Sequence, residues 1–308
     1  MRGANGRNPL KTSTASGILF VSLSYFVFTL HDAVVKLLVA DVSVWQILFF
    51  RSMTILIACL IIGGRGFIGR VVRTPVMKPM AVRSLFLLGA WFAYYAAAKS
   101  LQLAELTTIY YAAPVVATLL AIPILHEKVP PVRWAAIILG FVGVLIAANP
   151  VGLTISIPVG LALLAAVLWA GASVLLRKTA MSESTLVQMT LTNAFFVLMT
   201  CVMAIYHWKA VDLSSGVLLL LVGLLGGTAQ AALFEAMRRA PVSVLAPFEY
   251  SSLIWAFVLG YVIWADIPAS NVAFGAALIF CAGLLIVSSE RLAARRYRLG
   301  KPDEAKGA

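Results

Sequence analysis

Apolar runs long enough to cross a lipid bilayer recur along almost the whole chain and restrict what it can fold into. A membrane-spanning helix needs about 20 consecutive, mostly apolar residues. Of the 308 residues, 62% are hydrophobic and 12% are charged, whereas a soluble domain carries about twice that charged share. The sequence therefore predicts an all-α integral membrane protein with ten transmembrane helices, at 16–39, 43–63, 81–100, 105–125, 131–148, 157–178, 185–206, 214–237, 242–264 and 269–288.

The basic residues outside these windows fall almost entirely on one side of the predicted membrane. Only Lys99 and Lys209 fall on the opposite side, while both tails and the remaining basic loops share the first. Cytoplasmic segments of membrane proteins carry this excess of lysine and arginine. We therefore expect a multi-pass protein of a bacterial-type inner membrane with both termini cytoplasmic. The net charge of +12 does not predict nucleic-acid binding, since no polar domain could carry a basic face.

The sequence contains no arrangement typical of an enzyme, a metal site or a disulfide framework. Cys59, Cys201 and Cys281 lie inside apolar runs without histidine or cysteine at ligand spacing. Nucleotide-binding, hydrolase and metalloprotease motifs do not occur. We expect no enzymatic activity, no cofactor and no metal. An enzyme would need intramembrane chemistry from Asp32, Glu249 and His31.

The two halves of the chain resemble each other at a spacing of roughly 140 residues. Each half holds five predicted spans, and because five is odd, the second half must enter the membrane from the opposite side. Such inverted repeats are typical of carriers that expose one central site to each side in turn. The expected organisation is a tail at 1–15, a first repeat at 16–148, a periplasmic connection at 149–156, a second repeat at 157–288 and a basic tail at 289–308.

Several motifs together carry a family resemblance that covers residues from about 16 to 290. These are Arg51 in the second span, Tyr110-Tyr111-Ala-Ala-Pro114, Glu127-Lys-Val-Pro130, the span Trp134 to Ile146 with its two glycines, and Ala246-Pro247-Phe248-Glu249-Tyr250 through Asp266. With them the chain resembles the drug/metabolite transporter superfamily, specifically its ten-helix EamA-type members. The resemblance implies an inner-membrane carrier with a central cavity, acting on amino acids, vitamins, nucleotide-like metabolites or drugs.

Two positions depart from the pattern of that family. Its usual Gly-Glu at the end of the ninth span is Ala265-Asp266 here, and Leu253 replaces a proline expected within that helix. These departures weaken the expectation that the two repeats play fully symmetric parts.

Charged residues within the predicted spans are the first candidates for a functional site, because a charge at the bilayer centre costs at least ~2.5 kcal/mol. Asp32 and Arg51 reach the same depth in the first two spans, so an ion pair between them is available, with either a structural or a functional role. Lys36 could share that pair or extend to the membrane surface. His31 is either a proton-sensitive group or an ordinary buried polar residue. Glu249 has no cation at its depth in its own hairpin, which favours a role in binding substrate or protons over a structural hydrogen bond.

Aromatic and neutral polar residues within the spans complete the candidate site. The aromatic side chains could line a cavity for flat or cationic ligands, or could simply pack between helices. Asn193 and Gln230 could donate to substrate or bond across helices. Pro114 and Pro247 are expected to break their helices. Besides Asp32, Arg51 and Glu249, the predicted substrate-binding or coupling residues are Trp91, Tyr95, Tyr111, Trp169, Asn193, Gln230 and Tyr250.

Together these features predict a secondary transporter that moves small metabolites by alternating access, as a monomer or homodimer in the lipid bilayer. Amino acids, including aromatic ones, are the expected substrates, with export favoured and protons as a candidate coupling ion. Uptake of a vitamin or nucleotide-like metabolite is the alternative. An intramembrane enzyme and a passive channel are alternatives from other classes.

Overall fold

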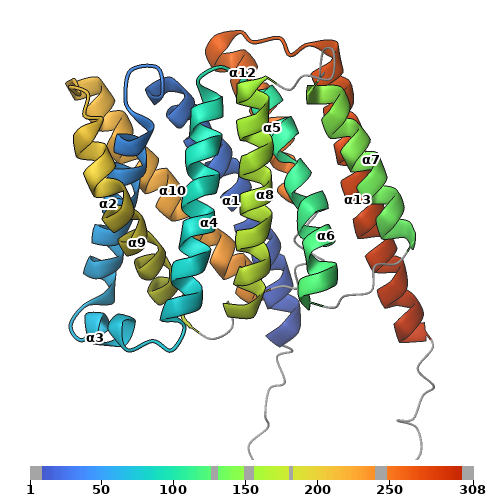
Figure 1. The fold of residues 1–308 in the computed structure, drawn as a ribbon. Helices are drawn as coiled ribbons and strands as arrows, with labels where there is room; N and C mark the ends of the chain where they lie inside the picture. The colour runs from blue at the N-terminus through green and yellow to red at the C-terminus, as the bar shows by residue number, and fades with distance from the viewer. Residues whose placement is uncertain (1–8, 126–130, 149–155, 180–182, 240–247, 300–308) are drawn as a thin grey trace, which may run out of the picture.

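The computed structural model describes residues 9–125, 131–148, 156–179, 183–239 and 248–299, and this part of the chain contains helices and no strand (Figure 1). The order of elements is α1 (Pro9–Leu38), α2 (Val44–Gly63), α3 (Phe67–Val72), α4 (Met77–Ala98), α5 (Leu103–Tyr110), α6 (Ala112–Leu125), α7 (Pro131–Ala148), α8 (Ile157–Thr179), α9 (Thr185–Tyr206), α10 (Leu213–Arg239), α12 (Ser251–Trp264) and α13 (Ser270–Leu299).

Six of these helices are long and apolar enough to cross a membrane: α1, α2, α4, α8, α9 and α10. Shorter apolar helices occupy the four other predicted windows, at Leu103–Ala117, Trp134–Ala147, Ser251–Trp264 and Ser270–Leu285. The prediction of an all-α membrane protein is thus confirmed. The arrangement of all ten windows as two inverted repeats stays a prediction.

The helix boundaries differ from the expected ones at both ends of the chain. The first helix begins at Pro9, inside the segment expected to be a tail, and the last continues past residue 288 to Leu299. The start of α1 and the end of α13 lie at the same end of the bundle (Figure 1). Neither extension is strongly apolar, so each lengthens a helix beyond its membrane-spanning window.

The predicted fourth span is two helices, α5 and α6, separated at Tyr111. Proline has no backbone N–H, so Pro114 cannot donate to the carbonyl of Tyr110 one turn earlier. Accordingly, α5 ends at Tyr110 and α6 begins at Ala112. Pro114 then falls in the first turn of α6, where no backbone donor is needed.

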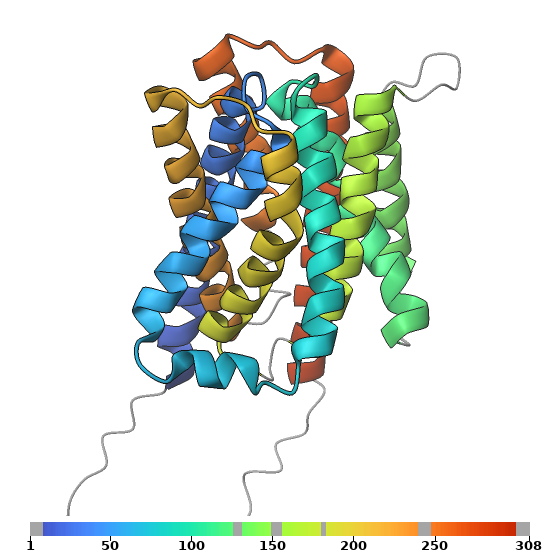
Figure 2. The same ribbon diagram turned by 60° about the vertical axis from the view of Figure 1, so that its left-hand side comes forward.

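The short helix α3 was not expected from the sequence. Gly64 and Gly66 adopt φ values of 64° and 81°, a left-handed backbone that glycine enters at little cost. These turns direct Phe67 into a buried cluster with Val187 and Leu191 of α9. As a result, α3 lies across the lower end of the bundle (Figure 2).

Long helices from the first half of the chain pack lengthwise against helices from the second half. The most extensive pairs are α1 with α10, α4 with α8, α2 with α9 and α7 with α13. Smaller contacts join α2 to α10, α4 to α9 and α5 to α12. The two halves are therefore interleaved around a common interior and do not form two separate bundles.

Glycines bring α7 and α13 unusually close together at one edge of the bundle (Figure 1). A Cβ atom on Gly143 would lie 2.8 Å from the carbonyl oxygen of Gly275, and one on Gly275 would lie 2.5 Å from that of Gly143. Such approach of two backbones requires residues without side chains. Gly223 and Gly227 of α10 lie in the same way against Thr54 and Ile55 of α2.

Candidate functional site

A cavity of about 780 Å³, counting the space open to solvent at its mouth, lies within the bundle. Seven helices contribute to its wall, namely α1, α4, α5, α6, α8, α10 and the start of α12, together with Tyr111 between α5 and α6 and Glu249 just before α12. The residues around it are Tyr25, Phe28, Thr29, Asp32, Ala90, Trp91, Tyr94, Thr107, Tyr110, Tyr111, Ala113, Trp169, Leu233, Glu249 and Ser252.

The charged side chains in this wall are both acidic. Asp32 and Glu249 reach the cavity, and no lysine or arginine is among the described residues that line it. A concave surface with one sign of charge and low-dielectric walls raises the local concentration of ligands of opposite charge. The cavity is therefore suited to a ligand with a positively charged group.

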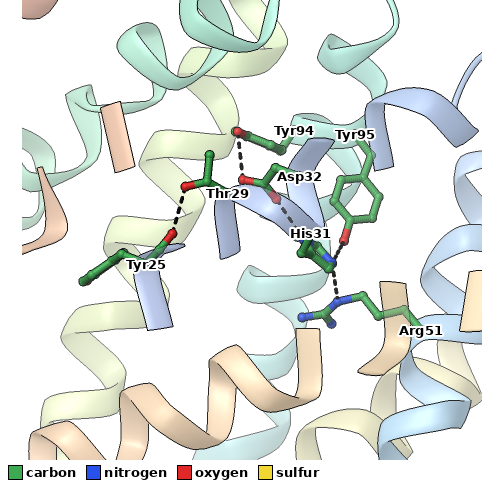
Figure 3. Close-up of polar contacts among 7 residues, drawn as sticks. All are labelled: Tyr25, Thr29, His31, Asp32, Arg51, Tyr94 and Tyr95. Atoms are coloured by element: carbon green, nitrogen blue, oxygen red, sulfur yellow. Dashed lines mark hydrogen bonds and ion pairs between the residues drawn. The ribbon is translucent and has the colours of Figure 1, made fainter. Parts of the chain in front are cut away.

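Asp32 is fixed by two side chains from different directions (Figure 3). Its Oδ1 lies 2.9 Å from Nδ1 of His31, and its Oδ2 accepts a hydrogen bond of 3.2 Å from the hydroxyl of Tyr94 on α4. Thr29, one turn earlier on α1, hydrogen-bonds the main-chain oxygen of Tyr25 at 2.8 Å. The contacts with His31 and Tyr94 hold the Asp32 carboxylate in place at the cavity wall.

Glu249 also lies in the cavity wall, just before α12 begins. Its carboxylate accepts a hydrogen bond from the hydroxyl of Tyr25 on α1. Its main-chain oxygen accepts hydrogen bonds from the hydroxyl of Tyr111 and from Oγ of Ser252, the latter at 3.0 Å. Tyr111, at the break between α5 and α6, thus holds the backbone at the start of α12.

The expected direct ion pair between Asp32 and Arg51 does not form, because His31 lies between them (Figure 3). Nε of Arg51 donates to Nε2 of His31 at 3.2 Å, and the hydroxyl of Tyr95 lies 3.2 Å from the same nitrogen. Nε2 must therefore be an acceptor, which leaves the proton of a neutral imidazole on Nδ1, where it is donated to Asp32. Asp32 and Arg51 are therefore linked through His31 and do not contact each other.

Lys36 takes no part in this network. Its Nζ donates to the carbonyl oxygen of Leu101 at 2.6 Å, in the turn between α4 and α5, and lies 5.5 Å from the ring centre of Trp264. The side chain therefore fastens the end of α1 to that turn. Lys36 therefore does not share an ion pair with Asp32, which was one of the two roles expected for it.

Aromatic rings form a continuous part of the cavity wall. Trp169 of α8 lies 6.3 Å from Trp91 and 6.2 Å from Tyr110, measured between ring centres, and Tyr110 lies 5.1 Å from Tyr94. Rings at such distances pack edge to face and leave other faces available to a flat or cationic ligand. Carboxylates and aromatic faces are thus combined in one cavity.

The predicted site residues separate into those at the cavity and those behind it. Asp32, Trp91, Tyr111, Trp169 and Glu249 line the cavity. The remaining predicted residues do not line it. Arg51 and Tyr95 contact His31, and the ring of Tyr250 stacks on that of Tyr111 at 5.3 Å between ring centres. Asn193 donates to the carbonyl of Met189 in its own helix, Gln230 is not part of the wall, Pro114 is in the first turn of α6, and Pro247 falls outside the residues that the structure describes.

Several cavity residues were missed by reasoning from the sequence. Tyr25, Phe28, Thr29 and Asp32 follow one another at the three- and four-residue spacing of a single helix face. This pattern in an otherwise apolar span is a signal that could have identified the α1 wall. Thr107 and Ser252 carry no comparable signal, since single hydroxyl residues are common in membrane helices.

Comparison with known proteins identifies a family for this chain. The model of the EamA-like transporter family matches residues 15–149 and again residues 156–288. A crystal structure of a protein has a TM-score of 0.64 with this chain at 21% sequence identity, covering 94% of this chain and 99% of its own. That likeness shows a shared fold.

Named relatives are transporters from bacteria. An S-adenosylmethionine uptake transporter of Rickettsia prowazekii (strain Madrid E) is 23% identical over 282 residues, which is 90% of this chain and 94% of the relative. The pseudopaline exporter of Pseudomonas aeruginosa (strain UCBPP-PA14) is 24% identical over 283 residues, covering 90% and 97%. A riboflavin transporter of Rhizobium johnstonii is 32% identical over 170 residues, covering 54% and 55%. Because the family model matches both halves, the chain is a multi-pass membrane transporter, not an enzyme, and belongs to the EamA-like transporter family within the drug/metabolite transporter superfamily.

Proposed function

We propose that the protein is a secondary transporter that carries a small metabolite with a positively charged group and a flat ring across a bacterial inner membrane by alternating access. One observation carries this proposal: two carboxylates and an aromatic wall meet in one cavity without a lysine or arginine among the described residues that line it. A cationic group would be bound by Asp32 and Glu249, and a ring would stack on Trp91, Tyr110 or Trp169.

Alternating access is supported by the way the halves of the chain pack. If α1 corresponds to α8, α2 to α9, α4 to α10 and α7 to α13, then exchanging the halves turns the pair α1 and α10 into the pair α8 and α4. Both pairs are extensive, and α2 with α9 and α7 with α13 exchange into themselves. This is the packing that inverted repeats related by a two-fold axis predict.

The names of the relatives narrow the class of substrate. S-adenosylmethionine combines a sulfonium cation, an ammonium group and a flat adenine ring, so its chemistry matches the two carboxylates and the aromatic wall. Aromatic amino acids, whose export we expected from the sequence, are the second candidate, because they also combine an ammonium group with a ring. Riboflavin has a flat ring but no cationic group, and it would leave both carboxylates without a partner.

Counterflow in proteoliposomes tests this proposal. Proteoliposomes that contain the purified protein are preloaded with unlabelled S-adenosylmethionine, phenylalanine or riboflavin. The entry of the same compound in labelled form is then followed. We expect saturable exchange of unmodified S-adenosylmethionine or phenylalanine, and little exchange of riboflavin. Saturable exchange of riboflavin alone would contradict a cationic substrate. Non-saturating flux would indicate a channel, and chemical conversion an enzyme.

A further inference from the structure

Arg51 is a buried cation that contacts no carboxylate among the described residues. Its side chain is 3% exposed, and its Nε bonds the neutral imidazole of His31. The two terminal nitrogens, Nη1 and Nη2, have no hydrogen bond to another described residue. A buried charge that no carboxylate balances is costly, and in a membrane span it normally serves a function.

The guanidinium group of Arg51 lies directly behind the cavity wall. Its Cζ is 4.3 Å from the ring centre of Trp91, and that ring lines the cavity. Figure 3 shows the side chain reaching from α2 toward His31, with the terminal nitrogens on the side away from α2. The Trp91 ring therefore lies between the guanidinium group and the cavity.

The neighbouring helix leaves room for this arginine. A Cβ atom on Gly226 of α10 would lie 2.9 Å from Nε of Arg51 and 3.1 Å from Cδ2 of His31. Any other residue at position 226 would push the guanidinium group away from its present place. The absence of a side chain here thus fixes where the charge lies.

We propose that Arg51 binds the carboxylate of the transported metabolite once Trp91 has turned aside. This inference rests on the proposed function and narrows it: the substrate carries a cationic group for Asp32 and Glu249 and a carboxylate for Arg51. The two terminal nitrogens of a guanidinium group can hold both oxygens of a carboxylate at once. Amino acids and S-adenosylmethionine have this pair of charges, whereas a simple amine lacks the carboxylate.

Pairs of ligands that differ only in the carboxylate test the inference. Binding to the purified protein is measured for S-adenosylmethionine and decarboxylated S-adenosylmethionine, and for tryptophan and tryptamine. We expect the carboxylated member of the bound pair to bind at least about tenfold more tightly in the wild type. Arg51→Gln should remove this preference while it leaves binding of the decarboxylated member within about threefold.

Two further variants separate this role from a structural one. Arg51→Lys keeps the charge but lacks the planar fork, so it should retain only part of the preference. Arg83→Gln changes a second arginine that is buried among the described residues, at 5% exposure, and that is not part of the cavity wall; it should leave the preference intact.

Each outcome bears on one of the two proposals. Equal binding of both members in the wild type, or an unchanged preference in Arg51→Gln, would overturn the role of Arg51 while a cation-binding transporter stands. The comparison within the wild type needs no variant, so it holds even if Arg51→Gln fails to fold. If none of the four compounds binds, both the proposal of a substrate with a cationic group and the role of Arg51 are overturned.

Discussion

Under the proposed function, cation binding depends most directly on Glu249. Its carboxylate has a tyrosine hydroxyl as donor and no described lysine or arginine beside it in the cavity wall. We expect Glu249→Gln to fold normally, because the amide oxygen can still accept the hydrogen bond from Tyr25. The transport rate should fall, or it should no longer show the change with pH that titration of a carboxylate produces.

The measurement is the initial rate of counterflow from about pH 5.5 to about pH 8. Glu105→Gln is the matched control, since Glu105 lies near the beginning of α5 and not in the cavity wall. Identical rates and pH profiles for Glu249→Gln and wild type would remove Glu249 from the mechanism.

His31 should transmit the interaction between Asp32 and Arg51, because it contacts both and they do not contact each other. We expect a double-mutant cycle of Asp32→Asn and Arg51→Gln to show a coupling free energy of about 0.5–3 kcal/mol in unfolding. In a His31→Ala background, the coupling should fall below about 0.5 kcal/mol. A coupling that survives loss of His31 would mean that the two charges pair directly.

Reasoning from the sequence placed Asp32 and Arg51 at one depth but could not place His31 between them. Depth follows from the rise per residue along each helix. Which side chain fills the space between two helices depends on their rotation about their axes, which the spacing of charges does not reveal. Tyr25 and Thr29 were missed for a related reason, since single hydroxyls in an apolar span resemble ordinary packing residues.

Ala265 ends α12 in a conformation that suits glycine better. Its φ is 55°, and its N–H bonds the carbonyl of Tyr261 at 2.9 Å. A left-handed backbone costs a residue with a Cβ atom about 1–2 kcal/mol, part of which the greater freedom of glycine in the unfolded chain offsets.

We therefore expect Ala265→Gly to raise the free energy of unfolding in detergent by about 0.5–1 kcal/mol. Ala273→Gly, within α13, is the control and should lower it by about 1 kcal/mol. Equal losses in both variants would contradict strain at Ala265.

At the scale of elements, the contact between α7 and α13 should tolerate no added side chain. A Cβ atom on Gly275 would lie 2.5 Å from the carbonyl oxygen of Gly143 and 2.8 Å from Cβ of Ala147. We expect Gly275→Ala to lower the free energy of unfolding by about 1–3 kcal/mol, because the helices must separate. Gly260→Ala in α12, where nothing lies within 4 Å, should be neutral or stabilising. Similar effects of both substitutions in thermal unfolding would argue against this close contact.

The positions of the elements could be predicted more fully than their interruptions. Hydropathy located every window because burial in lipid demands a long apolar run. Pro114 was recognised as a helix breaker, yet the sequence did not show that α5 would end completely and α6 begin anew. The short α3 depends on Gly64, Gly66 and two buried residues, Phe67 and Val71, within a loop too polar to produce a hydropathy signal.

At the scale of the whole molecule, α1 packs against α10 and α4 packs against α8, which is the pattern that the predicted inverted repeats would produce. The inversion itself stays a prediction, drawn from the odd number of predicted spans in each half. The cavity, in contrast, draws side chains from six helices and the start of α12. Its composition depends on how the halves interleave, and the sequence of either half alone does not contain that information.

Labelling from outside the cell can test the inversion. Arg70 follows the second predicted span and Lys209 follows the seventh, so they are equivalent positions in the two repeats. In the structure α3, which carries Arg70, lies at the lower end of the bundle, and the turn between α9 and α10, which carries Lys209, lies at the upper end (Figure 1). Inverted repeats therefore place them on opposite sides of the membrane.

Single cysteines at these positions, in a variant lacking Cys59, Cys201 and Cys281, are treated with a membrane-impermeant thiol reagent. We expect Lys209→Cys to react in intact cells and Arg70→Cys to react only in permeabilised cells, since basic loops stay cytoplasmic. Lys99→Cys is the control from the first repeat and should behave like Lys209→Cys. Reaction of Arg70→Cys and Lys209→Cys from the same side would mean that the repeats run in parallel. A cavity shared by parallel repeats could not open to each side in turn by exchanging the roles of the two halves, and the mechanism would need another moving element.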